Sequence, residues 1–417
     1  MTPSAAPCAP RSPISSPASP PTRSAGRGRR TRQAEVLPHL AVAALALVVT
    51  AALAPLVAAL ARRIGAVERS PDTGRPGGRR QVPTMGGLAM AAGALAALGL
   101  AWMLPAFAPL FDSTSEPLAL LVGVVVIVVI GALDDLRPLP PPVKLAGQIV
   151  AALGVVVFGV QLVHFWVPGI GVLALSSDIG LPLTVLALVA MINAVNLIDG
   201  LDGLAAGVAT IAAVAFLVFA GHNQLGGLSS ATLVGAIVIG VGLGFLVHNW
   251  HPARLYMGDT GSQLLGLLLG IAMISYVGRT TAPSNTDFFG SIPLLVPVLV
   301  LAVPFLDSAF AVVRRLASRR SVTAGDLGHL HHLLLAFGHS HRRAVLVLYY
   351  WSGVIAFGSV APAFLAWERL LPWLVVAGAL GIVMTALGSR PVEAPRAAEV
   401  PTAGTAVPAE RTATDTL

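Results

Sequence analysis

The chain has 417 residues, of which 55% are hydrophobic and only 11% charged, and its mean hydropathy is +0.81. Soluble globular proteins carry about 25% charged residues, so the composition excludes a soluble fold and indicates an integral membrane protein. The net charge of +7 comes from basic residues in short connections and one tail, with no nucleic-acid-binding motif, and the single Cys8 excludes a disulfide framework or a cysteine metal site.

Apolar runs of about 20 residues, the length needed to cross a bilayer, recur between two polar tails. Residues 1–36 and 389–417 are predicted to be disordered, because neither tail can build a core. Residues 37–388 are predicted to form an all-α polytopic bundle of eleven helices, since backbone polar groups in lipid must be satisfied within each segment. The predicted helices cover 37–61, 86–108, 117–133, 143–163, 180–198, 204–220, 230–248, 260–277, 291–313, 343–366 and 370–388.

Basic residues predict which ends of these helices face the cytoplasm. Connections after even-numbered helices carry little beyond Arg279 and Arg369, whereas those after odd-numbered helices carry fifteen basic residues. The positive-inside rule places the odd-numbered connections in the cytoplasm and the amino terminus outside, although that terminus carries an arginine cluster of its own. The fifteen are Arg62, Arg63, Arg69, Arg75, Arg79, Arg80, Arg137, Lys144, Arg254, Arg314, Arg315, Arg319, Arg320, Arg342 and Arg343.

Acidic, amide and histidine residues gather in four segments that all follow odd-numbered helices. In chain order these are "GALDDLRP", "NAVNLIDGLDGLAAG", "HNWHPARLYMGDTGS" and "GDLGHLHHLLLAFGHSHRRA". All four therefore fall on the side already assigned to the cytoplasm from Lys and Arg alone. Each segment has a plainer interpretation, as a solvated helix end, a polar loop, a glycine turn or a zinc-binding histidine group, but their convergence on one face favours a single site.

The residue types in these segments indicate phosphoryl transfer. Clustered carboxylates with oxygen-rich neighbours suit Mg²⁺, which takes one or two carboxylates and leaves room for substrate phosphates. Arg, Lys and His suit a diphosphate, and glycine-rich turns let backbone amides approach phosphate oxygens. A phosphate site beside lipid predicts a soluble nucleotide donor and a membrane-embedded phosphate acceptor.

Through the motifs in these segments, the sequence resembles the polyprenyl-phosphate N-acetylhexosamine-1-phosphate transferases. The motifs "PTMGG" (83–87), "LDD" (133–135), "NxxNxxDGLDGLAxG" (193–207), "NxxPARxxMGDTGS" (249–262) and "HLHH" (329–332) occur in family order. The resemblance implies an eleven-span enzyme of the bacterial plasma membrane with a cytoplasmic active site. It implies transfer of a sugar 1-phosphate from a UDP-sugar to a polyprenyl phosphate, with release of UMP, in the first membrane step of a cell-envelope polysaccharide. Mg²⁺, or Mn²⁺ in its place, is the implied cofactor, and a homodimer is a further expectation.

The histidine pattern separates the two branches of that family. His-x-His-His preceded by an Asp and an Arg pair, here Asp307, Arg314 and Arg315, resembles the branch that uses UDP-GlcNAc, in its actinobacterial form. The alternative is a lipid I synthase, which uses UDP-MurNAc-pentapeptide and carries three consecutive histidines. Leu327 and Leu333 stand where the first branch usually has basic residues, so two contacts to phosphate are expected to be missing.

Site residues follow from the resemblance, position by position. Asp259 and Asp199 are the expected metal ligands, and Asp134 and Asp135 are expected beside the lipid phosphate, which either attacks directly or follows a carboxylate that attacks first. The expected catalytic residues are Asp134, Asp135, Asp259 and His331, and the expected substrate-binding residues are Arg80, Lys144, Asn193, Asn196, Asp199, Asp202, Asn249, His329 and His332.

Two other classes remain as rivals. A transporter would use the carboxylates as an ion relay, but transporter sites usually lie near the bilayer midplane, whereas these acids lie at helix ends. An inactive or regulatory paralogue is the second rival, because of Leu327 and Leu333.

Overall fold

A computed structural model describes residues 24–71, 79–167, 171–222, 228–279 and 334–387, apart from residue 336. The ninth predicted helix, the histidines at 329–332, Leu327, Leu333, Asp307 and the tail at 389–417 lie outside these described residues.

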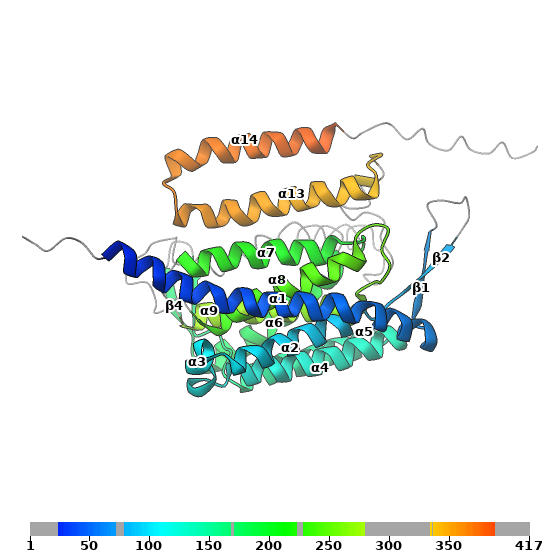
Figure 1. Cartoon of the computed structure of the whole chain (residues 1–417), viewed down its shortest axis with the longest axis horizontal. Coiled ribbons are helices and arrows are strands. Elements are labelled where there is room, and N and C mark those ends of the chain that lie inside the picture. Colours follow the sequence, from blue (N-terminus) through cyan, green and yellow to red (C-terminus); the bar gives the residue numbers. More distant parts are fainter. Residues whose placement is uncertain are drawn as a thin grey trace, which may run out of the picture.

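The described part is a bundle of long helices with nearly parallel axes (Figure 1), which confirms the predicted polytopic helical fold. Seven of the helices are long and apolar enough to cross a membrane, or eight spans if a bent pair counts as one. α9 packs against α2, α4, α6, α7 and α8, whereas α14 packs against α13. The long helices are α1 (Ser24–Ile64), α2 (Gly87–Met103), α4 (Glu116–Leu136), α5 (Pro141–Val157), α6 (Ser177–Ile198), α7 (Leu204–His222), α8 (Ser230–Asn249), α9 (Gly258–Arg279), α13 (His341–Val360) and α14 (Trp367–Ala386).

Some predicted helix ends differ from the structure. The first predicted span, 37–61, matches the apolar stretch Val36–Ile64, although α1 as a helix begins at Ser24. The fourth predicted helix is expected to run to residue 163, but α5 ends at Val157 and is shorter than the helices that could cross a membrane. The second span is not one straight helix to residue 108. It ends at Met103 and bends by 83° into Pro105–Ser113, since the residue before a proline is driven out of the helical region and Leu104 is extended.

Two short antiparallel hairpins were not predicted by the all-α assignment. β1 (Val67–Pro71) pairs with β2 (Arg79–Pro83), with Glu68 opposite Val82, and β3 (His164–Val167) pairs with β4 (Gly171–Ala174). The strands have four or five residues, too few for a period-two pattern to stand out. The β1–β2 hairpin projects beyond the bundle at the right-hand end of Figure 1.

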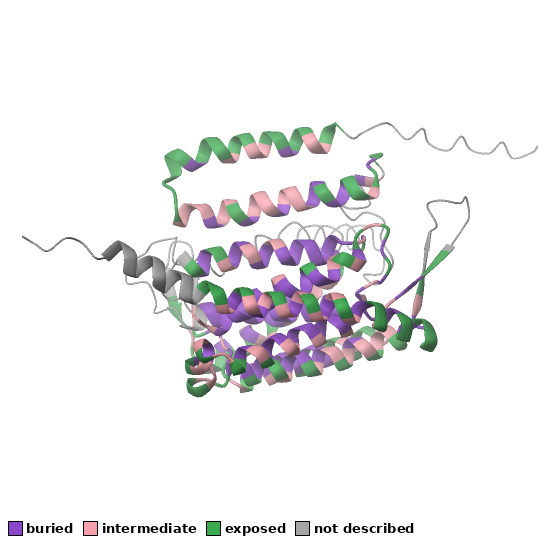
Figure 2. Ribbon diagram, in the orientation of Figure 1, coloured by how far each residue is buried: buried purple, intermediate pink, exposed green. Residues whose placement is uncertain are grey.

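Burial follows the arrangement expected of a membrane bundle. α7 and α8 are largely buried, whereas α14 is exposed along most of its length (Figure 2). Beyond its first turn, which carries the exposed Glu368 and Arg369, its exposed side chains are apolar, including Leu371, Trp373 and Ile382, which suits a helix whose outer face meets lipid. α8 and α9 instead form the middle of the core.

The described parts of the polar segments meet at one end of the bundle because the helices alternate in direction. α1, α4, α6 and α8 finish at the end where α2, α5, α7, α9 and α13 begin, on the right in Figure 1. Backbone hydrogen bonds join the start of α2 to the segment before α9, from Gly86 N to Tyr256 O and from Gly87 N to Met257 O, both at 2.9 Å.

Glycine makes this junction close enough. A Cβ on Gly87 would lie 2.1 Å from the backbone nitrogen of Gly261, and one on Gly131 would lie 2.5 Å from the Cα of Thr260. The starts of α2 and α9 and the last turns of α4 therefore pack backbone against backbone, which fixes the positions of the acids that follow Gly131 and Gly258.

We expect Gly87→Ala to destabilise the protein by about 1–3 kcal/mol, the usual cost of overpacking a filled core, and to lower activity because the start of α9 must shift. Gly99→Ala, on the same helix, is the matched control, because a Cβ there meets nothing within 4 Å. Thermal unfolding in detergent measures both variants, and equal midpoints would contradict the close packing.

Candidate functional site

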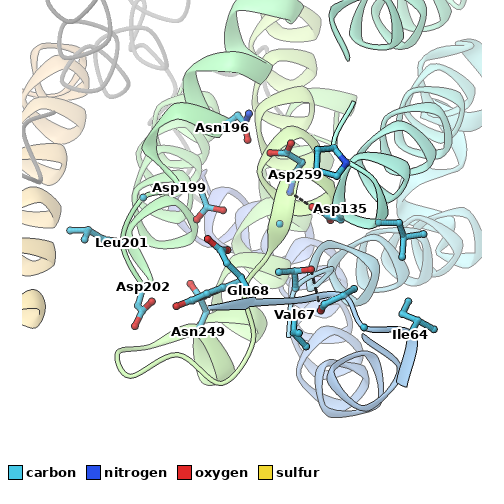
Figure 3. A pocket seen from close by; sticks show the side chains of 18 of the residues that line it. Ile64, Val67, Glu68, Asp135, Asn196, Asp199, Leu201, Asp202, Asn249 and Asp259 are labelled. Atoms are coloured by element: carbon cyan, nitrogen blue, oxygen red, sulfur yellow. Dashed lines mark hydrogen bonds between the residues drawn. The ribbon is translucent and has the colours of Figure 1, made fainter. Parts of the chain in front are cut away.

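A cavity of about 970 Å³ opens at the end of the bundle where the polar segments meet. Figure 3 shows carboxylate and amide side chains from four segments around it: strand β1, the end of α4, the end of α6 with the loop that follows, and the segment from the end of α8 to the start of α9. Of the predicted site residues, the lining includes Asp135, Asn196, Asp199, Asp202, Asn249 and Asp259.

Lys144 joins two of the predicted acids. Its ammonium lies 2.9 Å from Asp134 Oδ2 and also pairs with Asp259 Oδ2. Asp134 Oδ1 accepts a hydrogen bond from the Leu139 backbone N–H at 2.6 Å, which holds the carboxylate against the turn into α5. Asp134 and Lys144 do not line the cavity. Asp259, with which Lys144 pairs, does line it.

Asp135 differs from its neighbour. Its carboxylate accepts the backbone N–H groups of Asp259 at 2.7 Å and Thr260 at 3.2 Å, and the Thr260 hydroxyl at 2.5 Å. These are the first N–H groups of α9, which have no partner within their own helix. Asp135 therefore caps α9 and orients Asp259, while its predicted catalytic role stays a prediction.

Asn193 also lies apart from the cavity. Its amide donates to Gln148 Oε1 at 2.7 Å and to the Val189 carbonyl at 2.8 Å, and Gln148 donates in turn to Gln263 at 3.3 Å. This amide network ties α6 to α5 and α9, and Asn193 is not among the residues lining the cavity, so its contact with substrate stays a prediction. Asn196, one turn later, does line the cavity, where its Oδ1 accepts from Ser262 at 2.7 Å.

Asp199 follows the last turn of α6, and its backbone N–H donates to the Asn196 carbonyl at 3.3 Å. Its carboxylate lines the cavity and has no hydrogen bond to another described residue. Burial raises the pKa of its carboxyl to about 8, and the nearby charges of Asp259, Asp135, Glu68 and Asp202 add to this effect. Repulsion among these acids is the kind of cost that a divalent cation relieves, so the donor set fits a hard cation with oxygen ligands.

Asp202 is engaged on both its side chain and its backbone. Its Oδ2 accepts from His251 Nδ1 at 2.7 Å and from the Ala253 N–H at 3.0 Å, while its own N–H donates to His341 Nε2 at 3.1 Å. The two imidazole rings stack at 4.0 Å with an interplanar angle of 15°. Asp202, His251 and His341 are close enough to share a metal ion, and these hydrogen bonds use one possible ligand atom of each residue: Asp202 Oδ2, His251 Nδ1 and His341 Nε2.

Asn249 acts as a clamp between two loops. Its Oδ1 accepts from the Gly203 N–H at 2.8 Å, and its Nδ2 donates to the Leu255 carbonyl at 2.9 Å. The buried amide thus holds the backbone of both loops that form this part of the cavity wall, and its predicted contact with substrate stays a prediction.

Arg80 is exposed on β2 and does not line the cavity. His329, His331 and His332 lie outside the described residues, so their predicted roles stay predictions. The cavity is also lined by four residues that were not predicted from the sequence: Glu68, Tyr256, His251 and His341. His251 and His341 stand inside two of the quoted polar segments, whereas nothing in the Arg-rich stretch around Glu68 marks it.

Comparisons with known proteins identify the family of the chain. Residues 117–277 match the model of glycosyl transferase family 4. The chain is 40% identical over 292 residues to the decaprenyl-phosphate N-acetylglucosaminephosphotransferase of Mycobacterium leprae, covering 68% of this chain and 73% of that protein. It is 34% identical to a Bacillus subtilis protein named as a probable undecaprenyl-phosphate N-acetylglucosaminyl 1-phosphate transferase, covering 71% and 76%. Identity to the phospho-N-acetylmuramoyl-pentapeptide-transferase of Fusobacterium nucleatum is 26%, over 34% of this chain and 38% of that one.

Proposed function

We propose, since this chain belongs to glycosyl transferase family 4, that it transfers N-acetylglucosamine 1-phosphate from UDP-N-acetylglucosamine to a polyprenyl phosphate and releases UMP. The observation that carries the proposal is the identity of 38–40% with N-acetylglucosaminephosphotransferases over about three quarters of their length. The acid-lined cavity at one end of the bundle is the place where that reaction would occur.

The comparisons favour a small amino sugar as the donor. The relatives named for N-acetylglucosamine are matched over 73–78% of their length, whereas the Fusobacterium pentapeptide transferase is matched over 38%. This supports the UDP-GlcNAc interpretation of the histidine pattern over the lipid I synthase alternative.

The charge distribution supports a cytoplasmic site in a bacterial plasma membrane. The end of the bundle that carries the cavity also carries Arg62, Arg63, Arg137, Lys144 and Arg342. Cytoplasmic connections are enriched in Lys and Arg, and a UDP-sugar is supplied from the cytoplasm, so both arguments orient the protein in the same way.

Mg²⁺ is the proposed cofactor, held by Asp259 and Asp199. Both are carboxylates lining the same cavity, and oxygen donors of this kind suit Mg²⁺. When bound, the ion would neutralise negative charge on the diphosphate of the donor.

The chain's own residues would align and neutralise the reactants. We propose direct attack, in which an oxygen of the polyprenyl phosphate forms a bond to the β-phosphorus of the donor and the bond to the bridging oxygen of UMP breaks. Lys144, already paired with Asp134 and Asp259, lies where it could hold the acceptor phosphate beside the donor. Asp134 would take a proton from that phosphate, and Asp135 would keep Asp259 in place through the N-terminus of α9.

The test offers two donors in parallel to the purified full-length protein with decaprenyl phosphate and Mg²⁺. We expect UMP release and a lipid-linked product with UDP-GlcNAc, and at most a few per cent of that rate with UDP-MurNAc-pentapeptide. Product from the pentapeptide nucleotide alone would establish the lipid I synthase alternative. No UMP from either donor would favour a transporter or an inactive paralogue.

A further inference from the structure

The loop between α6 and α7, Asp199–Gly203, brings Asp199 to the cavity, yet the contacts that hold it lie at its other end. The Gly203 N–H donates to Asn249 Oδ1 at 2.8 Å, and the Gly203 carbonyl accepts from the Tyr349 hydroxyl at 2.5 Å. The Asp202 N–H donates to His341 Nε2 at 3.1 Å. Two of these three contacts come from α13, which is far from the loop in sequence.

Side chains of α13 and of the residues just before it divide between two neighbours. His341 and Tyr349 bind the backbone of the 199–203 loop, whereas His339 Nε2 lies 2.9 Å from the Thr385 carbonyl and the Tyr350 hydroxyl donates to the Ala377 carbonyl at 2.7 Å, both on α14. The chain thus carries a His and a Tyr directed at the cavity loop, next to a His and a Tyr directed at α14.

The contact of Tyr349 with the loop is tight. A Cβ on Gly207, at the start of α7, would lie 2.0 Å from the Tyr349 hydroxyl oxygen, and Gly203 itself has φ of +80°. The ring therefore rests on the glycine face of the loop and the first turn of α7, and a displacement of α13 would move the loop with it.

We propose that His341 and Tyr349 are positioning residues for the donor nucleotide: through them α13 sets the position of the 199–203 loop, and hence of Asp199, in the cavity. The proposal rests on the proposed function, which makes the cavity the site of a UDP-sugar. Neither residue needs to touch the reacting atoms.

The hydrogen bond from the Asp202 N–H to His341 makes the position of the 199–203 loop depend on pH. His341 Nε2 accepts this backbone N–H, so it must be unprotonated for the loop to be held. Among the described residues, the ring faces the Asp202 carboxylate and the stacked His251 ring, while Arg342 on its own helix donates to the His251 carbonyl at 3.1 Å. Protonation of His341 would remove this acceptor and place a positive charge beside the stacked His251 ring. The affinity for the donor nucleotide is therefore expected to fall when the pH is low enough to protonate His341.

The experiment compares matched variants of the full-length protein in detergent. Tyr349→Phe and His341→Leu are expected to raise the KM for UDP-GlcNAc by about 2- to 10-fold, the usual effect of one lost hydrogen bond, with kcat and the KM for decaprenyl phosphate changed less than twofold. The controls Tyr350→Phe and His339→Leu remove the same kinds of contact to α14 and are expected to change the donor KM less than twofold.

A conservative variant separates positioning from simple packing. His341→Gln keeps an acceptor without a titrating ring, so it is expected to recover part of the affinity lost in His341→Leu and to abolish the rise in donor KM at low pH. Tyr349 and His341 variants that shift KM no more than their controls, or that lower only thermal stability, would overturn the proposal.

Binding of UDP, measured by calorimetry, distinguishes this proposal from the proposed function. A wild-type protein that binds UDP but does not use UDP-GlcNAc would contradict the proposed function, and UDP affinity in the same variants would still decide the positioning role. A wild-type protein that binds no UDP would overturn both.

Discussion

Asp259→Asn is expected to lower kcat by at least about 10²-fold, the loss usually seen when one pre-organised electrostatic group is removed from an active site. Asp259 lines the cavity, pairs with Lys144, and is oriented by Asp135 through its own backbone N–H. The amide keeps the shape of the side chain but loses the charge that would hold Mg²⁺ and balance Lys144, so we expect the protein to fold and insert normally. UMP release across a range of Mg²⁺ concentrations measures the effect.

Asp178→Asn is the matched control, because Asp178 is an exposed acid in the first turn of α6, at the opposite end of the bundle. Its turnover is expected to equal that of the wild type. An Asp259→Asn protein with near-normal turnover at ordinary Mg²⁺ would remove Asp259 from the metal site, and the carboxylate of Asp199 would become the first residue to test.

Lys144→Met is expected to lower activity by a similar factor, but the loss should appear in the kinetics of the polyprenyl phosphate and in thermal stability. Lys144 is the only lysine in the chain, and its removal leaves Asp134 and Asp259 facing each other without their shared cation. We expect a loss of at least about 10²-fold in kcat/KM for the polyprenyl phosphate. Partly buried acids left unpaired also destabilise the fold, so the thermal midpoint is expected to fall as well.

Lys144→Arg is expected to keep the charge and recover part of the activity, because the guanidinium is planar and cannot replace a compact ammonium between two carboxylates without rearrangement. Arg137→Met is the control, since Arg137 is an exposed cation in the same connection. If Lys144→Met lowered stability but left the acceptor kinetics intact, Lys144 would be a structural counter-ion only.

The sequence by itself determined the membrane class, ten of the helices that the structure describes, and the gathering of the polar segments at one end. A helix in lipid satisfies its backbone hydrogen bonds locally, so an apolar run of sufficient length predicts it without knowledge of its neighbours. Because successive spans reverse direction, the order of the polar segments along the chain already assigns them to one face.

Only the tertiary structure decided what individual polar residues do there. Asp134 and Asp135 are adjacent in sequence, yet one pairs with Lys144 and the other caps α9; Asn193 and Asn196 are one turn apart, yet only Asn196 lines the cavity. His341 and Tyr349 reach the 199–203 loop across about 140 residues of chain. A side chain finds its hydrogen-bond partner among the groups that another element brings within about 3 Å. Which element comes that close is decided by the packing of the whole bundle, so it cannot be predicted from the neighbouring residues in the sequence.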